Sequence, residues 1–338
     1  MIVVAKDGSG DFTTIQSAVD AIPFDGRPET LLIRPGVYAE RVVVSRDNLR
    51  LVGQSREATV ITHSACANDP NPDGTPRGTF LSFTMLVTGD NVEVEDLTIR
   101  NDAGDGREVG QAVAVYAAGD RSVWRHCSLI AHQDTLFCGP LMSNVVREFA
   151  PETPRAKYVR NVGDCPEVQC RQYFEDCLIR GDVDFIFGPW RCWFERCTLY
   201  MNARGGWYTA ANTPEREPYG LVFHCCRLTG ECASGEARLG RPWRPWARTL
   251  FLACDMDECV SPRGFADWDS DRVVTRRCGE WATTGVRADL STRHPTQARL
   301  TDAEAAAITP AQVLSGADNW HPDLHGYTTR QRPVANPS

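Results

Sequence analysis

Residues 177–188, CLIRGDVDFIFG, place two acids in a short apolar run that ends at a glycine. The second of these acids, Asp184, lies seven residues after Cys177, and another acid, Asp134, lies seven residues after Cys127. If the two cysteines occupy equivalent places in a repeating unit, the two aspartates project from the same face of stacked units. The spacing therefore predicts a pair of carboxylates.

The same unit recurs six times along the chain. Each copy has an anchor residue, an apolar residue three positions before it and another two positions after it. The anchors are Leu97, Cys127, Cys177, Cys197, Cys226 and Cys254. The preceding residues are Val94, Trp124, Phe174, Phe194, Phe223 and Phe251, and the following ones are Ile99, Leu129, Ile179, Leu199, Leu228 and Met256. This pattern predicts in each unit a strand with one inward face of period two.

Successive anchors are 30, 50, 20, 29 and 28 residues apart. Units of about 20 to 30 residues, each with short strands and turns, are typical of a β-solenoid, in which a coil buries its inner face only by stacking on the next. The interval of 50 predicts an insertion in one coil, at about residues 139–172. Because the repeat is continuous, we expect residues 1–338 to form a single all-β domain.

Helices are expected only near the ends of this solenoid. Residues 11–23 carry apolar residues at helical spacing and end at a proline, which predicts a helix that caps the first coil. The first strands are expected at residues 31–33 and 42–44, on either side of a turn. Near the other end, residues 301–304 have the spacing of a helix capping box and residues 310–316 are expected to form a second short helix. The segment from about 285 to 338 is expected to cover the last coils.

Composition narrows the class of protein. The formal net charge is −8 and no Lys/Arg run is present, which argues against nucleic acid or anionic lipid as the main partner. No stretch approaches the roughly 18 consecutive apolar residues that indicate a membrane span. The chain opens on MIVVA, without the pattern of a secretory signal, so it is expected to be cytoplasmic if this is its full length and secreted if a signal was removed. The sequence leaves both open.

The 14 cysteines contain no Cys-x-x-Cys pair, and five of them are anchors of the repeat. Free cysteine behaves as a small buried hydrophobic residue, so we expect the anchors to lie in the core. The sequence predicts neither a metal site nor a cofactor.

Two acids and two amides are candidates for chemistry. Gln133 directly precedes Asp134, and Gln111 begins the stretch QAVAV. Parallel strands lie about 4.8 Å apart, so equivalent carboxylates in adjacent coils could not easily both be ionised. One would serve as nucleophile or base and the other as acid. Asp182 shares a strand face with Asp184, and only the seven-residue offset favours Asp184 as the partner of Asp134.

Arg241 lies in the stretch RLGRPWRPW, residues 238–246, which is too rich in Arg, Trp and Pro for a simple strand. A guanidinium can bind a carboxylate in a bidentate manner, and an indole can stack on a sugar ring. This combination suits an acidic sugar as ligand.

Six stretches, taken together and in order, resemble the pectin methylesterase family. They are VAKDGSGDF (4–12), GVYAE (36–40), QAVA (111–114), QDTL (133–136), DFIFG (184–188) and LGRPW (239–243). The resemblance covers about residues 3 to 320. It implies a right-handed parallel β-helix and the hydrolysis of galacturonate methyl esters in pectin, which releases methanol and an acid.

The resemblance also assigns roles to individual positions. It implies a nucleophile at Asp184, an acid and later base at Asp134, amides that hold the oxyanion at Gln111 and Gln133, and substrate-binding side chains at Arg241, Trp243 and Thr79. The implied partner is pectin or methyl-esterified oligogalacturonides, and we expect a monomer. The chain is expected to depart from plant-like members in two ways, by lacking an inhibitory pro-region and by carrying a long insertion after QDTL, as in some bacterial members. That insertion leaves the length of substrate and the pattern of attack open.

Three other functions are to be distinguished from ester hydrolysis on the same fold. A polysaccharide lyase would need acids for calcium and a basic residue as the base, and neither is evident. A glycosidase would use two carboxylates, which the pair at 134 and 184 does not exclude. A solenoid that only binds glycans would make no use of the acids and amides. If the chain is an esterase, its substrate could also be another carboxylic ester or a thioester.

Overall fold

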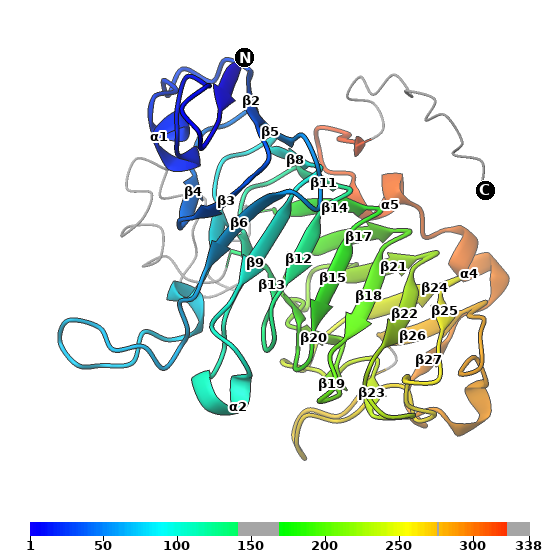
Figure 1. Ribbon diagram of the computed structural model, residues 1–338. Coiled ribbons are helices and arrows are strands. Elements are labelled where there is room, and N and C mark those ends of the chain that lie inside the picture. Colours follow the sequence, from blue (N-terminus) through cyan, green and yellow to red (C-terminus); the bar gives the residue numbers. More distant parts are fainter. Residues whose placement is uncertain (141–168, 276, 323–338) are drawn as a thin grey trace, which may run out of the picture.

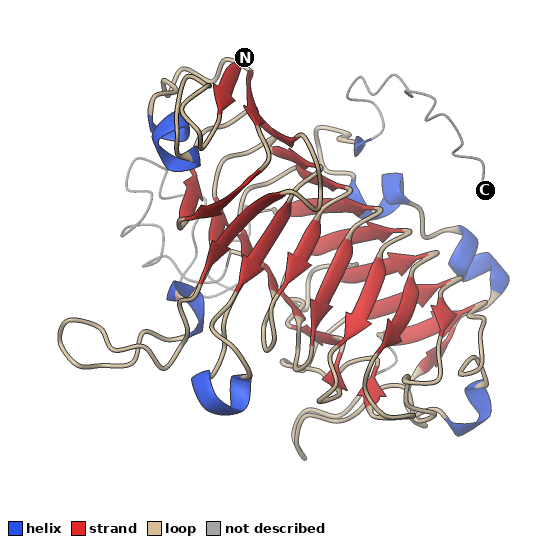
Figure 2. Cartoon of the chain, viewed as in Figure 1, coloured by secondary structure: helices blue, strands red, loops and turns tan. Residues whose placement is uncertain are grey.

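The computed structural model describes residues 1–140, 169–275 and 277–322. Three parallel sheets wrap around one core, and along much of the chain each coil contributes a strand to each sheet in turn (Figures 1 and 2). This is a parallel β-helix, so the expected fold class is confirmed. No helix in the described ranges is long and apolar enough to cross a membrane.

The largest sheet, called sheet A here, has eleven strands. In spatial order they are β1 (Ile2–Val4), β2 (Glu29–Ile33), β5 (Leu49–Gly53), β8 (Glu93–Glu95), β11 (Ser122–Arg125), β14 (Arg171–Glu175), β17 (Arg191–Glu195), β21 (Leu221–His224), β24 (Thr249–Leu252), β26 (Cys278–Trp281) and β27 (Ala298–Arg299).

Sheet B has eight strands: β3 (Gly36–Ala39), β6 (Thr59–His63), β9 (Thr98–Asn101), β12 (Ser128–Ile130), β15 (Leu178–Gly181), β18 (Thr198–Met201), β22 (Arg227–Gly230) and β25 (Asp255–Met256). Sheet C has six: β4 (Val42–Val44), β7 (Met85–Val87), β10 (Val115–Ala117), β13 (Leu136–Cys138), β16 (Ile186–Gly188) and β20 (Thr209–Ala211). A small separate pair joins β19 (Gly206–Trp207) to β23 (Ala237–Arg238).

The repeat of the sequence corresponds to the bend between sheets A and B. The residue directly before each anchor has a positive φ, between 51° and 53°, and turns the chain from one sheet into the next. The expected single strand per unit is therefore wrong. The unit is two strands, and the bend explains why residues three before and two after an anchor can both point inward.

The predicted register is present on both sides of the bend. In sheet A, Phe174, Phe194, Phe223 and Phe251 are paired in adjacent strands, and their rings stack at centroid distances of 4.4 to 4.7 Å. The cysteine anchors are buried beside them as free thiols. Burial raises the pKa of the Cys226 thiol well above its usual value, which keeps this group neutral in the core.

The N-terminal helix α1 (Ile15–Asp20) is shorter than residues 11–23, because Thr14 already caps its first turn. Its buried residues close the first coil, as expected. The strands expected at 31–33 and 42–44 are present, and a further strand, β3, lies between them after the expected turn. Short helical turns also occur at η1 (Thr79–Leu81), α2 (Gly106–Val109) and η3 (Leu290–Thr292).

The insertion ends earlier than predicted, since Arg171 and Gln172 belong to β14. Most of it, residues 141–168, lies outside the described residues, as do residues 323–338 of the C-terminal segment.

The C-terminal helices α4 (Asp302–Ala306) and α5 (Pro310–Leu314) are present, and α4 begins with the predicted capping box. The first part of the segment lies on the last coils, as expected, because β27 pairs with β26 and Trp281 of β26 donates to Asp302 in α4. The position of α5 differs from the expectation. Val313 and Leu314 pack instead on the outer face of sheet A, against residues of middle coils such as Tyr173 and Trp193. The segment thus runs back along the sheet (Figure 1).

Candidate active site

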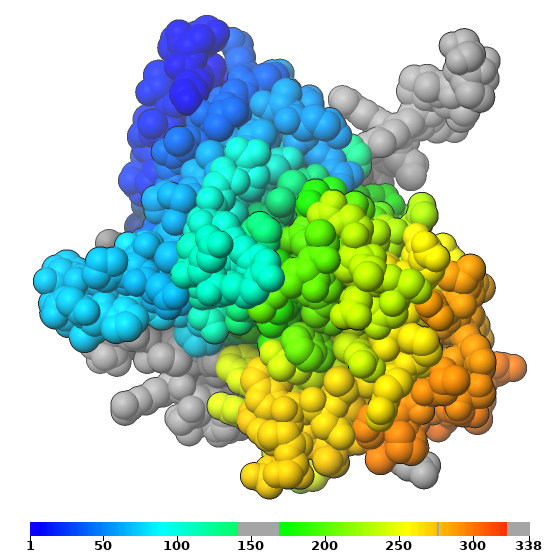
Figure 3. All heavy atoms as spheres, turned by 60° about the horizontal axis from the view of Figure 1, so that its bottom comes forward, coloured from blue at the N-terminus to red at the C-terminus, as the bar shows by residue number. Residues whose placement is uncertain are grey.

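The loops that lead from sheet B to sheet C carry the candidate acids. Successive parts of the chain follow one another in sequence order along the molecule (Figure 3). Asp134 lies two residues before β13, and Asp184 lies two residues before β16. These strands pair Leu136 with Ile186, so the two acids hold equivalent places in adjacent coils. The N–H of Asp134 donates to the carbonyl oxygen of Val183 at 3.0 Å, which ties the loops together.

Both carboxylates are buried, but their surroundings differ. Burial raises the pKa of Asp134 well above its usual value, and the negative charge of Asp184 adds to this effect. Burial also raises the pKa of Asp184, while hydrogen bonds and charge from Arg241 oppose it. The arrangement therefore favours a proton on Asp134 and a charge on Asp184.

Arg241 binds the Asp184 carboxylate in a bidentate manner. Its Nε donates to Oδ1 at 2.9 Å and its Nη2 donates to Oδ2 at 2.7 Å. The guanidinium lies between two indole rings, 3.8 Å from the centroid of Trp207 and 4.2 Å from that of Trp268. Two flat aromatic faces and two hydrogen bonds fix the orientation of this cation and of the carboxylate it holds.

Asp182 is engaged elsewhere. It is fully buried, and its Oδ2 lies 2.8 Å from Nδ1 of His132, while the N–H of Val183 donates to its Oδ1. The backbone N–H of Asp182 also donates to the carbonyl oxygen of His132. These contacts join the two loops, and they disfavour the alternative that the sequence leaves open, in which Asp182 is the functional acid.

The two glutamines border the same loops. Gln133 directly precedes Asp134, and its backbone carbonyl accepts a hydrogen bond from Ala112, the residue after Gln111. Both side chains are partly exposed, and neither amide hydrogen-bonds to another residue in the described part of the chain. Their side-chain N–H groups therefore have no hydrogen-bond acceptor among the described residues.

A row of aromatic side chains lies on the outer face of sheet C beside the acids. Ring centroids are 4.9 Å apart for Phe80 and Phe137, 4.7 Å for Phe137 and Phe187, and 6.1 Å for Phe187 and Trp243. Thr79 adjoins the far end of this row through its neighbour Phe80. The structure thus places Trp243 near the acids, on the coil next to β20, and Thr79 on the opposite side of the row.

The described residues also form a pocket of about 210 Å³ on the sheet B side of the loops. His132, Arg180 and Asn202 contribute to its lining, and neither candidate acid does. The hydrogen bonds of Asn202, to the carbonyl of Ala131 and from Nε of Arg180, already satisfy most of its polar groups. We assign no chemistry to this pocket.

A family model described as Pectinesterase matches residues 1–143 and 167–317. The chain belongs to the pectinesterase family. A probable pectinesterase/pectinesterase inhibitor from Arabidopsis thaliana is 31% identical over 337 residues, and the match covers 95% of this chain but 53% of that protein. The chain thus spans about half the length of this relative. Pectinesterase 31 of the same plant is 30% identical, with coverage of 90% and 89%.

Solved structures of pectin methylesterases are also similar to this chain. A pectin methylesterase in complex with a hexasaccharide superposes with a TM-score of 0.76 at 30% identity, over 95% of this chain and 98% of that one. A pectin methylesterase from Erwinia chrysanthemi gives the same values. One from carrot has a TM-score of 0.75 at 29% identity, over 93% and 92%.

Sequence reasoning missed both tryptophans beside Arg241 in this pectinesterase-family site. Trp207 could have been found, because it lies two residues before β20, which pairs with β16, and so takes the place of Asp184 in the next coil. Trp268 lies on the loop between β25 and β26, outside the repeat. No spacing in the sequence predicts its contact with Arg241.

Proposed function

We propose that the chain hydrolyses methyl esters of galacturonate in pectin, releasing methanol and polygalacturonate, and that it needs no metal or cofactor to do so. The observation that carries this proposal is the unequal pair of buried acids. One carboxylate is held charged by a bidentate arginine, and the other, in the adjacent coil, favours its neutral form. Ester cleavage needs a nucleophile and a proton donor in this arrangement.

In the first half-reaction, a carboxylate oxygen of Asp184 attacks the ester carbonyl carbon. The carbonyl oxygen becomes negatively charged, and the side-chain N–H groups of Gln111 and Gln133 donate to it. Asp134 gives its proton to the methoxy oxygen as the bond to carbon breaks. Methanol leaves, and the galacturonyl group remains on Asp184 as an anhydride.

In the second half-reaction, Asp134 is a carboxylate and takes a proton from water. The hydroxide that forms attacks the anhydride carbonyl, and the bond to Asp184 breaks. Asp184 recovers its charge and its contact with Arg241, and Asp134 recovers its proton. Each residue ends in its initial state, so one water is consumed for each ester.

For the ligand, we propose pectin or methyl-esterified oligogalacturonides, with Arg241, Trp243 and Thr79 as binding residues. The aromatic row would offer faces on which sugar rings stack, and the Arg241 guanidinium adjoins the carboxylate of Asp184, the proposed nucleophile. The hexasaccharide bound to the related pectin methylesterase supports an oligosaccharide as ligand.

The test is a product assay on methyl-esterified polygalacturonate. We expect methanol release without unsaturated products and without new reducing ends. Unsaturated products would indicate a lyase instead, and new reducing ends without methanol would indicate a glycosidase. Simple alkyl and thioester substrates, run in parallel, would show whether another carbonyl substrate is preferred.

A further inference from the structure

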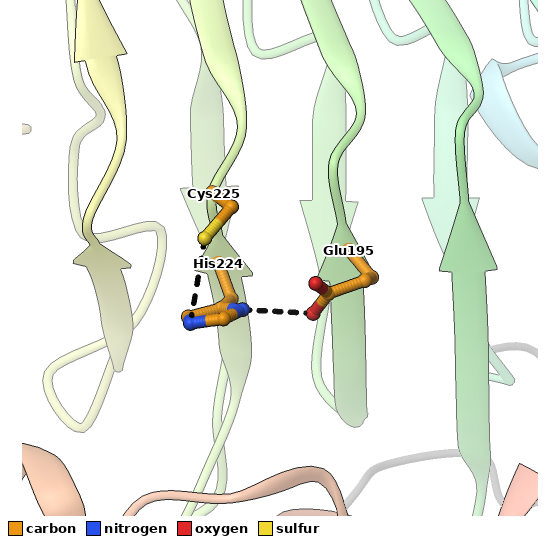
Figure 4. A group of neighbouring side chains, drawn as sticks. All are labelled: Glu195, His224 and Cys225. Atoms are coloured by element: carbon orange, nitrogen blue, oxygen red, sulfur yellow. Dashed lines mark hydrogen bonds and ion pairs between the residues drawn. The ribbon is translucent and has the colours of Figure 1, made fainter. Parts of the chain in front are cut away.

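A second group of reactive side chains lies away from the candidate acids, on the bend from sheet A into sheet B. Glu195 ends β17, His224 ends β21 and Cys225 follows it (Figure 4). One potential metal-binding atom from each of the three residues lies within 4.8 Å of the others. It is the one group of this kind within the described ranges.

The geometry of this group resembles a zinc site before the ion binds. The Sγ atom of Cys225 lies 3.5 Å from Nε2 of His224. A zinc–sulfur bond of about 2.3 Å and a zinc–nitrogen bond of about 2.0 to 2.1 Å at a tetrahedral angle separate the two ligand atoms by about 3.5 Å. Sulfur and nitrogen could therefore bind one ion with little movement.

Glu195 holds the imidazole of His224 in the tautomer that can bind a metal through Nε2. Its Oε2 lies 2.8 Å from Nδ1 of His224 and accepts the proton there, which leaves the lone pair of Nε2 free for a metal. Histidine ligands of metals commonly donate their second N–H to a carboxylate in this way. Trp193 donates to the same oxygen at 2.8 Å and Arg196 donates to Oε1 at 3.1 Å, so the carboxylate itself is fixed.

Neither packing nor backbone preference accounts for cysteine at position 225. Its φ is 52°, a conformation in which Asn, Asp and Gly are favoured, and its side chain is exposed. The next residue, Cys226, is the core anchor of this coil and is buried. The thiol of Cys225 therefore points away from the core toward His224.

We propose that Cys225 and His224, oriented by Glu195, bind a single zinc-class ion, a divalent cation of borderline to soft character. The thiol of Cys225 would lose its proton to solvent as the sulfur–metal bond forms, and water would complete the coordination. The ion would lie at the corner between sheets A and B. The candidate acids lie at the corner between sheets B and C, so this site does not rest on the proposed esterase function.

Cobalt(II) is a suitable probe, because a thiolate ligand gives it a charge-transfer absorption in the near ultraviolet. We expect the full chain to show this band with one equivalent of cobalt, to lose it when zinc is added, and to keep it when magnesium is added. Calorimetry with zinc should give at least tenfold weaker binding for Cys225→Ser and for His224→Gln. Glu195→Gln should weaken binding by about tenfold, since it acts through the imidazole.

Cys232→Ser is the matched control, because Cys232 is a partly exposed cysteine outside this group. We expect it to bind zinc like the unchanged chain. Circular dichroism would check the folding of each variant, and position 225 is exposed, so serine there should fold. Absence of the thiolate band would overturn the proposal, and so would zinc affinities of Cys225→Ser and His224→Gln that equal the affinity of the unchanged chain. Glu195 and His224 would then be only a cross-strand contact, like Arg125 with Glu175. Methanol release should be the same with and without bound zinc.

Discussion

The contact between Arg241 and Asp184 sets the charge on the proposed nucleophile. The active form needs Asp184 ionised and Asp134 protonated, so activity should rise with pH as Asp184 loses its proton and fall as Asp134 loses its own. Arg241 lowers the pKa of both acids. In Arg241→Gln both values should rise, and the acid limb of the profile should move to higher pH.

The measurement is kcat/KM for methanol release across the pH range. We also expect at least a roughly tenfold loss at the optimum, about 1.4 kcal/mol, because the side chain also binds substrate. Arg227→Gln is the control, since Arg227 is an exposed arginine of sheet B with a loose ion pair to Asp257. An acid limb that stays in place in Arg241→Gln would contradict the proposed role.

Replacing each of the two acids should impair catalysis in a different way. Asp184→Asn removes the nucleophile and should abolish turnover. Asp134→Asn keeps the nucleophile but loses the proton donor and the base for water. Its defect should be smaller on an aryl ester, whose leaving group needs no proton, than on a methyl ester.

Methanol or phenol release by both variants, with folding checked by circular dichroism, tests this difference. Asp182→Asn is the matched control, because Asp182 is also buried in the same loop but contacts His132. It should keep more activity than Asp184→Asn. An inactive Asp182→Asn beside an active Asp184→Asn would mean that the nucleophile is assigned to the wrong residue.

Trp243 should contribute by stacking on substrate. Trp243→Ala should lower kcat/KM on methyl-esterified polygalacturonate by at least roughly tenfold. The control is Trp246→Ala, since Trp246 lies in the same segment but is 45% exposed and packs on Arg277 rather than on the aromatic row. If Trp243→Ala has the same kinetics as the unchanged chain, Trp243 is not part of the binding site.

At the level of elements, the sequence predicts the inward positions of the coils but not the path of the chain between them. The anchors repeat because every coil buries the same positions against its neighbours, and such a pattern is local and visible. The sequence does not reveal the bend, because the residues with positive φ at this position are as different as Asp176, Arg196 and Ala253. A left-handed conformation is imposed there by the stacking of whole coils, which overrides local preference.

The same distinction applies to the candidate site. Asp134 and Asp184 could be paired from spacing alone because both lie at fixed offsets within the repeat. Trp268 approaches Arg241 from a loop whose conformation depends on contacts distant in sequence. Likewise, the contact of His132 with Asp182 follows from the directions of two side chains, which the period of a strand does not determine.

The stacked phenylalanines of sheet A should contribute strongly to stability. Phe194 is fully buried, with ring centroids of Phe174 and Phe223 at 4.7 Å and 4.4 Å. Phe194→Ala should lower the free energy of unfolding by about 3 to 5 kcal/mol, because a cavity remains between the neighbouring rings. Denaturant titration measures the loss. Phe24→Ala is the control, since Phe24 is 54% exposed; an equal loss there would contradict the prediction.

At the scale of the whole molecule, one hydrophobic core runs through successive coils from Val4 to Cys278. The C-terminal segment adds a second layer on the outer face of sheet A. Arg171, in β14, donates to Asp318 at 2.5 and 2.8 Å, and Arg125, in β11, donates to the carbonyl oxygen of Pro322 at 3.3 Å. Because these contacts join residues 318–322 to middle coils, we propose that the coils and this segment unfold together as one domain.

Leu314→Ala tests this coupling. Leu314 is fully buried against sheet A, in one cluster with Trp193 and Trp320, so its truncation should lower the free energy of unfolding by about 2 to 5 kcal/mol. If the coils and the segment form one cooperative unit, the variant should still unfold in a single transition, at the same denaturant concentration by tryptophan fluorescence and by far-ultraviolet circular dichroism. Val286→Ala, at a position that is 73% exposed, should leave the midpoint within experimental error. Two separate transitions, with only one moved by Leu314→Ala, would mean that the segment folds independently of the coils beneath it.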